Sequence, residues 1–262
     1  MSSDEGEVRG ALAGSMFSIE IDRPAKLNGF TPKMLAELAA AYTTFEREAA
    51  ARVAVVSAVG SHFTAGLDLP KVGPIMARGE PLFPPDAVDP FDLRPPRRSK
   101  PVVVAVKGVT FTLGIELMLA ADIVVAADDC RFSQLEVKRG IMAAGGATLR
   151  MVQRAGWGDA MLILLAAGEF GAADALRLGF VQEVVPAGRE LARAQQIAAA
   201  VAAQAPLAVQ ATLHNARLAL ERGFAAAAAE FAETNRRLSA TADAAEGVRS
   251  FVEKRPARFE GR

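Results

Sequence analysis

Two stretches of the chain, residues 63–69 (FTAGLDL) and 111–117 (FTLGIEL), share the pattern F-T-x-G-x-acid-L. Each follows a valine-rich run and leads into a predicted helix, so each glycine falls where the backbone turns sharply or is approached closely. The first N–H groups of a helix lack partners within it and favour negative charge. Two such turns side by side would aim the amides of Ala65 and Leu113 at one oxygen, which predicts an oxyanion hole for a carbonyl group.

Acidic side chains stand close behind three successive predicted strands. Asp68 and Glu116 occupy matching places in the two similar stretches, and Glu136 closes a third fragment, residues 132–136 (FSQLE). The similarity also fits a simpler interpretation, in which two packing units of a repetitive fold have glycine at tight turns. The residues alone leave both interpretations open.

The elements that must position these groups alternate along the chain. Residues 53–59, 101–106 and 123–127 are short apolar runs typical of buried strands. Thr31 before Pro32 predicts a helix that begins there and ends near Arg47. Nine of the 14 prolines lie between residues 70 and 101, which indicates a loop or broken helix. From about residue 191 the chain is alanine-rich and helical, so the whole predicts an α/β fold.

Composition narrows the partners and the chemistry. Lys and Arg number 30 against 30 Asp and Glu, so no overall field favours nucleic acid or an anionic membrane. Cys130 is the single cysteine, and His62 and His214 stand alone, so neither a disulfide framework nor a metal site is expected. No apolar run reaches the length of a membrane span or a signal peptide. We therefore expect a cytoplasmic protein.

The motifs HFTAGLDL and KPVVVAVKGVTFTLGIELMLAADIVVAADDCRFSQLEVKRGIMAAGGATLR resemble the signature regions of the crotonase superfamily, the enoyl-CoA hydratases and isomerases. The resemblance extends from about residue 21 to the tail. It implies an α/β, crotonase-like (ClpP/crotonase) spiral of ββα units with a C-terminal helical trimerisation region. We thus expect a disordered leader over residues 1–14, a spiral core with the acyl-CoA site over 15–195, and a helical oligomerisation region over 196–262.

The resemblance also implies roles for individual residues. Ala65 and Leu113 match the family's oxyanion-hole amides, and Glu116 and Glu136 match the two glutamates of the hydratases. Glu116 would deprotonate a water and Glu136 would protonate the α-carbon, turning trans-2-enoyl-CoA into 3-hydroxyacyl-CoA in fatty-acid or related metabolism. Such a pair shares one proton because its two charges repel. No cofactor is expected, since coenzyme A is part of the substrate.

Further residues would contact the acyl-CoA thioester. Family members use the segments that match Ala25, Lys26 and Leu27 and the turn residues Gly66, Leu67, Asp68, Leu69 and Gly114. Phe251 and Lys254 in the tail would reach the ligand of a neighbouring subunit, because the resemblance implies a homotrimer or a hexamer built as a dimer of trimers.

Some residues depart from the pattern or have simpler explanations. Thr112 and Leu113 stand where many hydratases have consecutive glycines, so side chains intrude near the thioester. An isomerase or other crotonase reaction, and a non-catalytic acyl-CoA-binding protein, therefore remain alternatives to a hydratase. Asp68 equally fits a helix cap or salt bridge. Residues 97–100 (RRSK) are expected to form a solvated basic flank.

Overall fold

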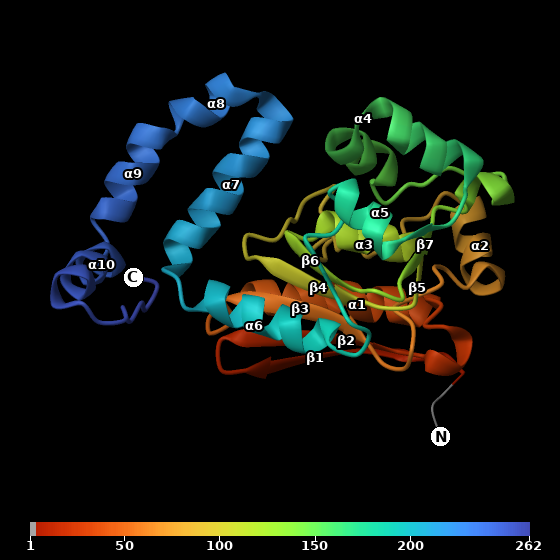
Figure 1. The fold of residues 1–262 in the computed structure, drawn as a ribbon, viewed down its shortest axis with the longest axis horizontal. Coiled ribbons are helices and arrows are strands. Elements are labelled where there is room, and N and C mark those ends of the chain that lie inside the picture. Colours follow the sequence, from red (N-terminus) through yellow and green to blue (C-terminus); the bar gives the residue numbers. More distant parts are fainter. Residues whose placement is uncertain (1–3) are drawn as a thin grey trace.

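The computed structural model describes residues 4–262, and its core is built on two sheets (Figure 1). The large sheet has the order β1 (Glu7–Ala13), β2 (Met16–Asp22), β3 (Val53–Ala58), β4 (Val102–Val106), β6 (Ile123–Ala127) and β9 (Glu183–Val185). All its neighbouring pairs are parallel except β1 and β2. The small sheet has the order β5 (Val109–Phe111), β7 (Arg131–Ser133) and β8 (Phe170–Gly171).

The chain repeats one unit of two strands and a helix. β4 in the large sheet is followed by β5 in the small sheet and by α3 (Leu113–Ala120). β6 and β7 repeat this step and precede the 3-10 helix η2 (Glu136–Arg139) and α4 (Ala147–Ala166). Before them, β3 is followed by a bridge between Thr64 and Thr110 and by α2 (Leu69–Ala77). The predicted spiral of ββα units is therefore confirmed, and it brings successive turns next to one another.

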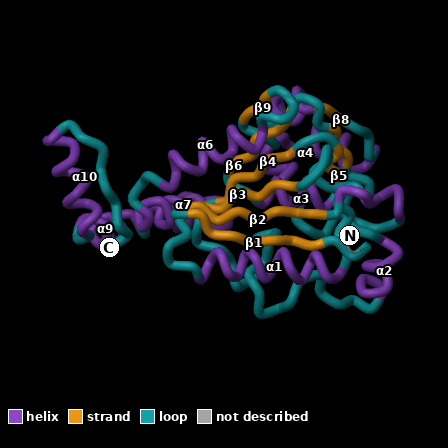
Figure 2. Tube along the Cα trace, turned by 90° about the horizontal axis from the view of Figure 1, so that it is seen from below, coloured by secondary structure: helices purple, strands orange, loops and turns teal. Residues whose placement is uncertain are grey.

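Alternate valines of the sheet face two different layers. Val53, Val55 and Val103 pack with the alanines of α6 (Glu190–Ala202). Val56 and Val104 belong to the larger cluster that includes α1 (Pro32–Arg47) and α3. Figure 2 shows α1 and α6 on opposite sides of the strands. Both faces are thus buried, which explains continuous valine runs in place of alternation. Each buried valine stabilises the fold by about 1.5–3 kcal/mol.

The prediction of a disordered leader is wrong for residues 7–13. They form β1, which pairs with β2 from Glu7 opposite Asp22 to Ala13 opposite Met16. Of this strand only Val8 is buried, so its stability comes from the backbone ladder and not from an apolar pattern of its own. Gly14, with φ 60°, and Ser15 form the two-residue connection, a hairpin signal that the sequence does contain. Residues 1–3 of the predicted leader lie outside the described residues.

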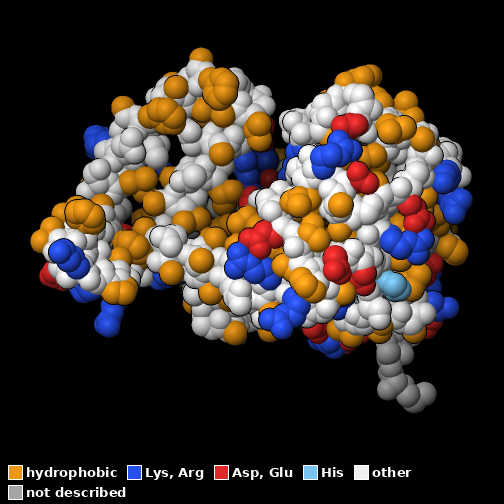
Figure 3. All heavy atoms as spheres, in the orientation of Figure 1, with side chains coloured by type: hydrophobic (Ala, Val, Ile, Leu, Met, Phe, Trp, Pro, Cys, Tyr) orange, Lys and Arg blue, Asp and Glu red, His pale blue; other side chains and the backbone are white. Residues whose placement is uncertain are grey.

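The C-terminal helices form an arm beside the core (Figure 1). They are α7 (Pro206–Arg222), α8 (Phe224–Ala229), α9 (Phe231–Ser239) and α10 (Ala242–Glu253), while the short α5 (Ala172–Arg177) belongs to the core. The predicted boundary after residue 195 falls inside α6, which covers the sheet, so the arm begins at Pro206. Apolar side chains including Phe224 and Phe231 are exposed on it, and Figure 3 shows such side chains gathered over the arm.

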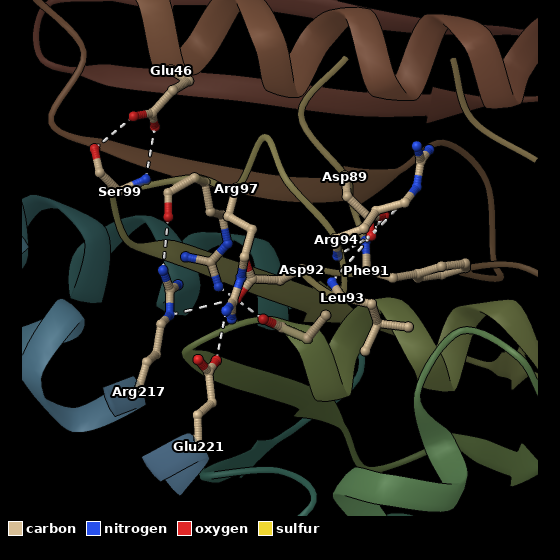
Figure 4. Close-up of polar contacts among 12 residues, drawn as sticks. Glu46, Asp89, Phe91, Asp92, Leu93, Arg94, Arg97, Ser99, Arg217 and Glu221 are labelled. Carbon is tan, nitrogen blue, oxygen red and sulfur yellow. Dashed lines mark hydrogen bonds and ion pairs between the residues drawn. The ribbon is translucent and has the colours of Figure 1, made fainter. Parts of the chain in front are cut away.

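Ion pairs hold α7 against the core (Figure 4). Arg217 donates to the Arg98 carbonyl at 2.7 Å, and Glu221 pairs with Arg97, which also pairs with Asp92. Within residues 4–262, no single helix is both long and apolar enough to cross a membrane. The bent pair α6 and α7, at 106°, meets those criteria only jointly.

The expectation of a solvated flank at residues 97–100 is wrong for two of its cations. Arg98 is buried and pairs with Asp122 at 2.6 Å, while the Lys100 ammonium donates to the carbonyls of Phe45 and Glu48. These partners are distant in sequence, so no local pattern predicts that Arg98 and Lys100 are buried.

Candidate active site

The two similar turns lie against each other, as the sequence predicts. Phe111 N–H donates to the Thr64 carbonyl at 2.9 Å across the bridge between the two strands. A Cβ on Gly66, whose φ is +104°, would lie 1.9 Å from Thr112 Oγ1, and one on Gly114 would lie 2.7 Å from Thr64 Cγ2. Each turn therefore occupies the space that a side chain on the other's glycine would need.

A cavity of about 220 Å³ opens beside this contact. Its lining consists of both turns, the two predicted glutamates and an apolar wall, namely Ala65, Leu67, Leu69, Leu82, Phe91, Thr112, Leu113, Glu116, Leu135, Glu136, Arg139 and Ile141. Leu82 and Phe91 come from the proline-rich segment, where the Phe91 ring packs edge-on against Phe83 at 5.1 Å. The proline-rich loop thus forms a wall of the cavity.

The Glu116 carboxylate is held by the start of another helix. Its side chain is buried, and Oε1 accepts hydrogen bonds from Gly145 N–H at 2.6 Å and Ala147 N–H at 3.3 Å. Ala147 is the first residue of α4, whose N-terminal dipole favours negative charge there. A Cβ on Gly145 would lie 2.5 Å from Glu116 Oε2, so only glycine fits. The sequence prediction did not include these amides, although paired glycines before a helix are the signal for them.

Glu136 opens the 3-10 helix η2 and lines the same cavity. Its Oε1 accepts a hydrogen bond from the Gln134 side chain at 3.1 Å. Its Oε2 is buried, and no residue from 4 to 262 donates to it. A buried carboxyl oxygen without a partner is costly unless a ligand or water satisfies it. This oxygen therefore has an unused capacity to accept a hydrogen bond, on a residue that lines the cavity.

Burial raises the pKa of both carboxyl groups. The Glu116 pKa is raised first by burial and then by the charge of Glu136, against the opposing hydrogen bonds from Ala147 and Gly145, to about 7. Burial also raises the Glu136 pKa. The pair therefore keeps one proton up to about neutral pH. An acid and a base then stand side by side at the same pH.

The raised pKa of Glu116 predicts a pH-dependent stability. The ordinary value of 4.5 applies to the unfolded chain, so between pH 4.5 and about 7 the native state holds an extra proton and loses stability as pH rises. The expected loss from this group is on the order of 2–3 kcal/mol. Urea unfolding at pH 5 and pH 8 should show Glu116→Gln gaining stability relative to wild type at the higher pH. A difference between the two proteins that stays constant with pH would contradict this.

The predicted role of the Ala65 amide is contradicted by its hydrogen bond. Ala65 N–H donates to the Leu27 carbonyl at 2.9 Å and is therefore occupied. Leu113, in contrast, is the first residue of α3, where an N–H has no partner within the helix. Leu67 N–H also meets no acceptor in the described part of the chain, and both residues line the cavity. The unpartnered amides are thus those of Leu67 and Leu113.

The error has a structural reason. α3 begins directly after Thr112, whereas α2 begins only at Leu69, so matching letters stand at different distances from the two helices. Pro70, which favours the first turn of a helix, was the signal that the first turn is longer.

The remaining predicted residues are placed in three ways. Ala25, Lys26 and Leu27 lie exposed at η1 (Pro24–Lys26), next to the first turn. Asp68 pairs with buried Arg23 at 2.8 Å, which confirms the salt-bridge alternative. Phe251 and Lys254 lie at the end of α10, and Figures 1 and 2 show α10 far from α2 and α3, the helices that begin at the cavity. Within residues 4–262, no three His, Cys, Asp or Glu side chains are grouped to hold a metal ion.

The paired sheets, the repeated ββα units and the helical arm together define a protein of the crotonase fold. Residues 12–262 match the enoyl-CoA hydratase/isomerase family, and the chain belongs to that family. The crystal structure of a probable enoyl-CoA hydratase/isomerase of Mycobacterium abscessus matches the fold with a TM-score of 0.94. Its sequence is 46% identical, and the match covers 97% of this chain and 98% of that one.

The names of the relatives include both hydratases and a dehydratase. A mevalonyl-coenzyme A hydratase of Aspergillus fumigatus is 34% identical over 90% of this chain and 88% of its own length. A carnitinyl-CoA dehydratase of Proteus mirabilis is 31% identical over 95% of this chain and 96% of its own length. The predictions of the family, of the fold and of a lyase-type enzyme are thereby confirmed.

Proposed function

We propose that this chain is an enoyl-CoA hydratase that adds water to a trans-2-enoyl-CoA and forms a 3-hydroxyacyl-CoA. The main support is the carboxyl pair, because Glu116 and Glu136 line one cavity and burial raises the pKa of both. Addition of water needs a base at one carbon and an acid at the next, and a pair with one proton supplies both. The names of several relatives agree with this chemistry.

In the proposed mechanism, the thioester carbonyl oxygen accepts hydrogen bonds from the Leu67 and Leu113 amides. This draws electrons away from the double bond and stabilises the enolate that forms when water attacks the β-carbon. One carboxylate takes a proton from the water, and the other carboxyl gives a proton to the α-carbon. The family resemblance assigns these roles to Glu116 and Glu136 respectively.

The surroundings suggest how the rest of the substrate binds. Leu82, Phe91 and Ile141 provide an apolar wall for acyl carbons. The exposed segment with Lys26 lies beside the first turn, where its ammonium can meet a phosphate of coenzyme A. The exposed apolar side chains of the arm favour the expected homotrimer or hexamer, in which Phe251 and Lys254 would lie near a partner's ligand.

The direct test is turnover of crotonyl-CoA, followed by the loss of absorbance of its conjugated thioester. We expect saturable loss of absorbance and 3-hydroxybutyryl-CoA as the product, identified by mass. The matched substrate is a 3-enoyl-CoA, which an isomerase converts to the conjugated form with a gain of absorbance and no added water. Isomerisation without hydration would favour the isomerase alternative. Tight binding of both thioesters without turnover would favour a non-catalytic acyl-CoA-binding protein.

A further inference from the structure

Thr112 has a backbone conformation that threonine rarely adopts. Its φ is +47° and its ψ is −113°, in the region that glycine enters freely and that is an outlier for a β-branched residue. The backbone is fixed on both sides, since Thr112 N–H donates to Ser133 and the Thr112 carbonyl accepts from Glu116 N–H. Strained residues of this kind gather at functional sites, where the rest of the fold holds them in place.

The Thr112 hydroxyl lies between the two turns. A Cβ on Gly66 would come within 1.9 Å of Oγ1, which therefore sits directly over the residue that precedes Leu67. Thr112 itself precedes Leu113 and lines the same cavity. The hydroxyl thus belongs to the residue before Leu113 and lies against Gly66, the residue before Leu67.

The threonine at the matching place of the first turn behaves differently. Thr64 Oγ1 donates to the Asn28 carbonyl at 2.7 Å and accepts a hydrogen bond from Gly66 N–H at 3.0 Å, so its hydrogen bonds hold the turn. Thr112 Oγ1 has no hydrogen-bond partner among residues 4–262. A hydroxyl carries one proton to donate, and a half-buried one gains most from an acceptor that arrives with the ligand.

We propose that Thr112 is a further catalytic residue, whose hydroxyl is a third hydrogen-bond donor to the thioester carbonyl oxygen beside the Leu67 and Leu113 amides. The inference rests on the proposed function for the identity of the thioester. The contact strengthens as the oxygen becomes negative in the enolate, because hydrogen bonds to charged groups are stronger than those to neutral ones. It therefore acts on kcat more than on KM.

The test compares Thr112→Val, which keeps the branched shape and the backbone strain, with Thr112→Ser, which restores the hydroxyl. We expect Thr112→Val to lower kcat for crotonyl-CoA on the order of 10- to 100-fold with a smaller change in KM. Thr112→Ser should recover most of the loss. The control is Thr110→Val, since Thr110 Oγ1 is buried without a partner outside the cavity and its loss should leave kcat unchanged.

A spectroscopic readout separates hydrogen bonding from a structural role. Binding of a cinnamoyl-CoA thioester should shift its absorbance to longer wavelength as the carbonyl is polarised, less so in Thr112→Val and again fully in Thr112→Ser. Thr112→Gly, which removes the backbone strain, should also show the smaller shift while melting no lower than wild type. It replaces the valine variant if that protein does not fold.

The inference would be overturned if the valine or glycine variant kept the kcat and the absorbance shift of the wild type. It would also be overturned if the kcat of the serine variant were no higher than that of the valine variant. The absorbance shift needs no turnover. A wild-type protein that shifts the cinnamoyl spectrum without hydrating crotonyl-CoA would contradict the proposed function, and the Thr112 variants would still decide the contact.

Discussion

Replacing Glu116 with glutamine is expected to lower kcat for crotonyl-CoA hydration on the order of 100- to 10,000-fold, the range that positioned proton transfer contributes. Glutamine keeps an oxygen for the Gly145 and Ala147 amides, so the turn before α4 should stay in place. What it loses is the ability to take or give a proton. Steady-state rates across pH 5 to 9 would show the loss of activity. Thermal melts followed by circular dichroism would show that the variant is folded.

Two companion variants sharpen the result. Glu136→Gln should cause a loss of similar size, and the double variant should lose little more than either single one, because the pair acts as a unit. Glu190→Gln is the matched control, since Glu190 is a buried carboxyl with one unpartnered oxygen on α6 and does not line the cavity. Hydration that survives Glu116→Gln unchanged would show that the two-carboxyl mechanism is wrong. Loss of hydration with isomerisation retained would favour chemistry that depends on Glu136 alone.

Leu113→Pro is expected to lower kcat by about 100- to 1,000-fold, the usual cost of removing one oxyanion-hole donor. Proline has no N–H, and Leu113 is the first residue of α3, the helix position where proline is best tolerated. The substitution therefore removes the proposed donor with little change to the helix. The control, Leu113→Ala, keeps the N–H while shortening the side chain, so its kcat should stay much closer to wild type. Melting temperatures of both variants establish whether they are folded.

The comparison between these two variants carries the conclusion about the amide. If Leu113→Pro is folded and retains the kcat of Leu113→Ala, this N–H does not stabilise the developing charge. If both variants lose activity equally, the leucine side chain matters and the amide does not. Either outcome would remove the Leu113 amide from the proposed oxyanion hole, while the roles of the Leu67 amide and of the glutamates would be judged on their own variants.

Local signals predicted much of the fold. Thr31 caps α1 and accepts a hydrogen bond from Met34 N–H, and the helix spans Pro32–Arg47 as predicted. The three valine-rich runs are β3, β4 and β6, within one residue at their ends. Pro206 opens α7, and Gly223 lies between α7 and α8, where the chain turns from one helix into the next. These features depend on side chains near in sequence, whose preferences act before any distant contact forms.

Features that depend on distant partners were predicted less well. β1 forms because its backbone pairs with that of β2. Arg98 is buried because it forms an ion pair with Asp122, which is distant in sequence. The oligomeric state, the cytoplasmic location and the roles of Lys26, Phe251 and Lys254 stay predictions.

The sequence alone determined the family and the alternation of strands and helices, and it singled out Glu116 and Glu136 as candidates, because these follow from residue types and their order. Only the tertiary structure decided which amides are unpartnered. The Ala65 amide donates to the Leu27 carbonyl, whereas the Leu67 and Leu113 amides have no partner among the described residues. It also decided that the amides at the start of α4 hold Glu116 and that burial beside Glu136 raises its pKa. Hydrogen-bond partners and local dielectric are set by groups distant in sequence, so no motif specifies them.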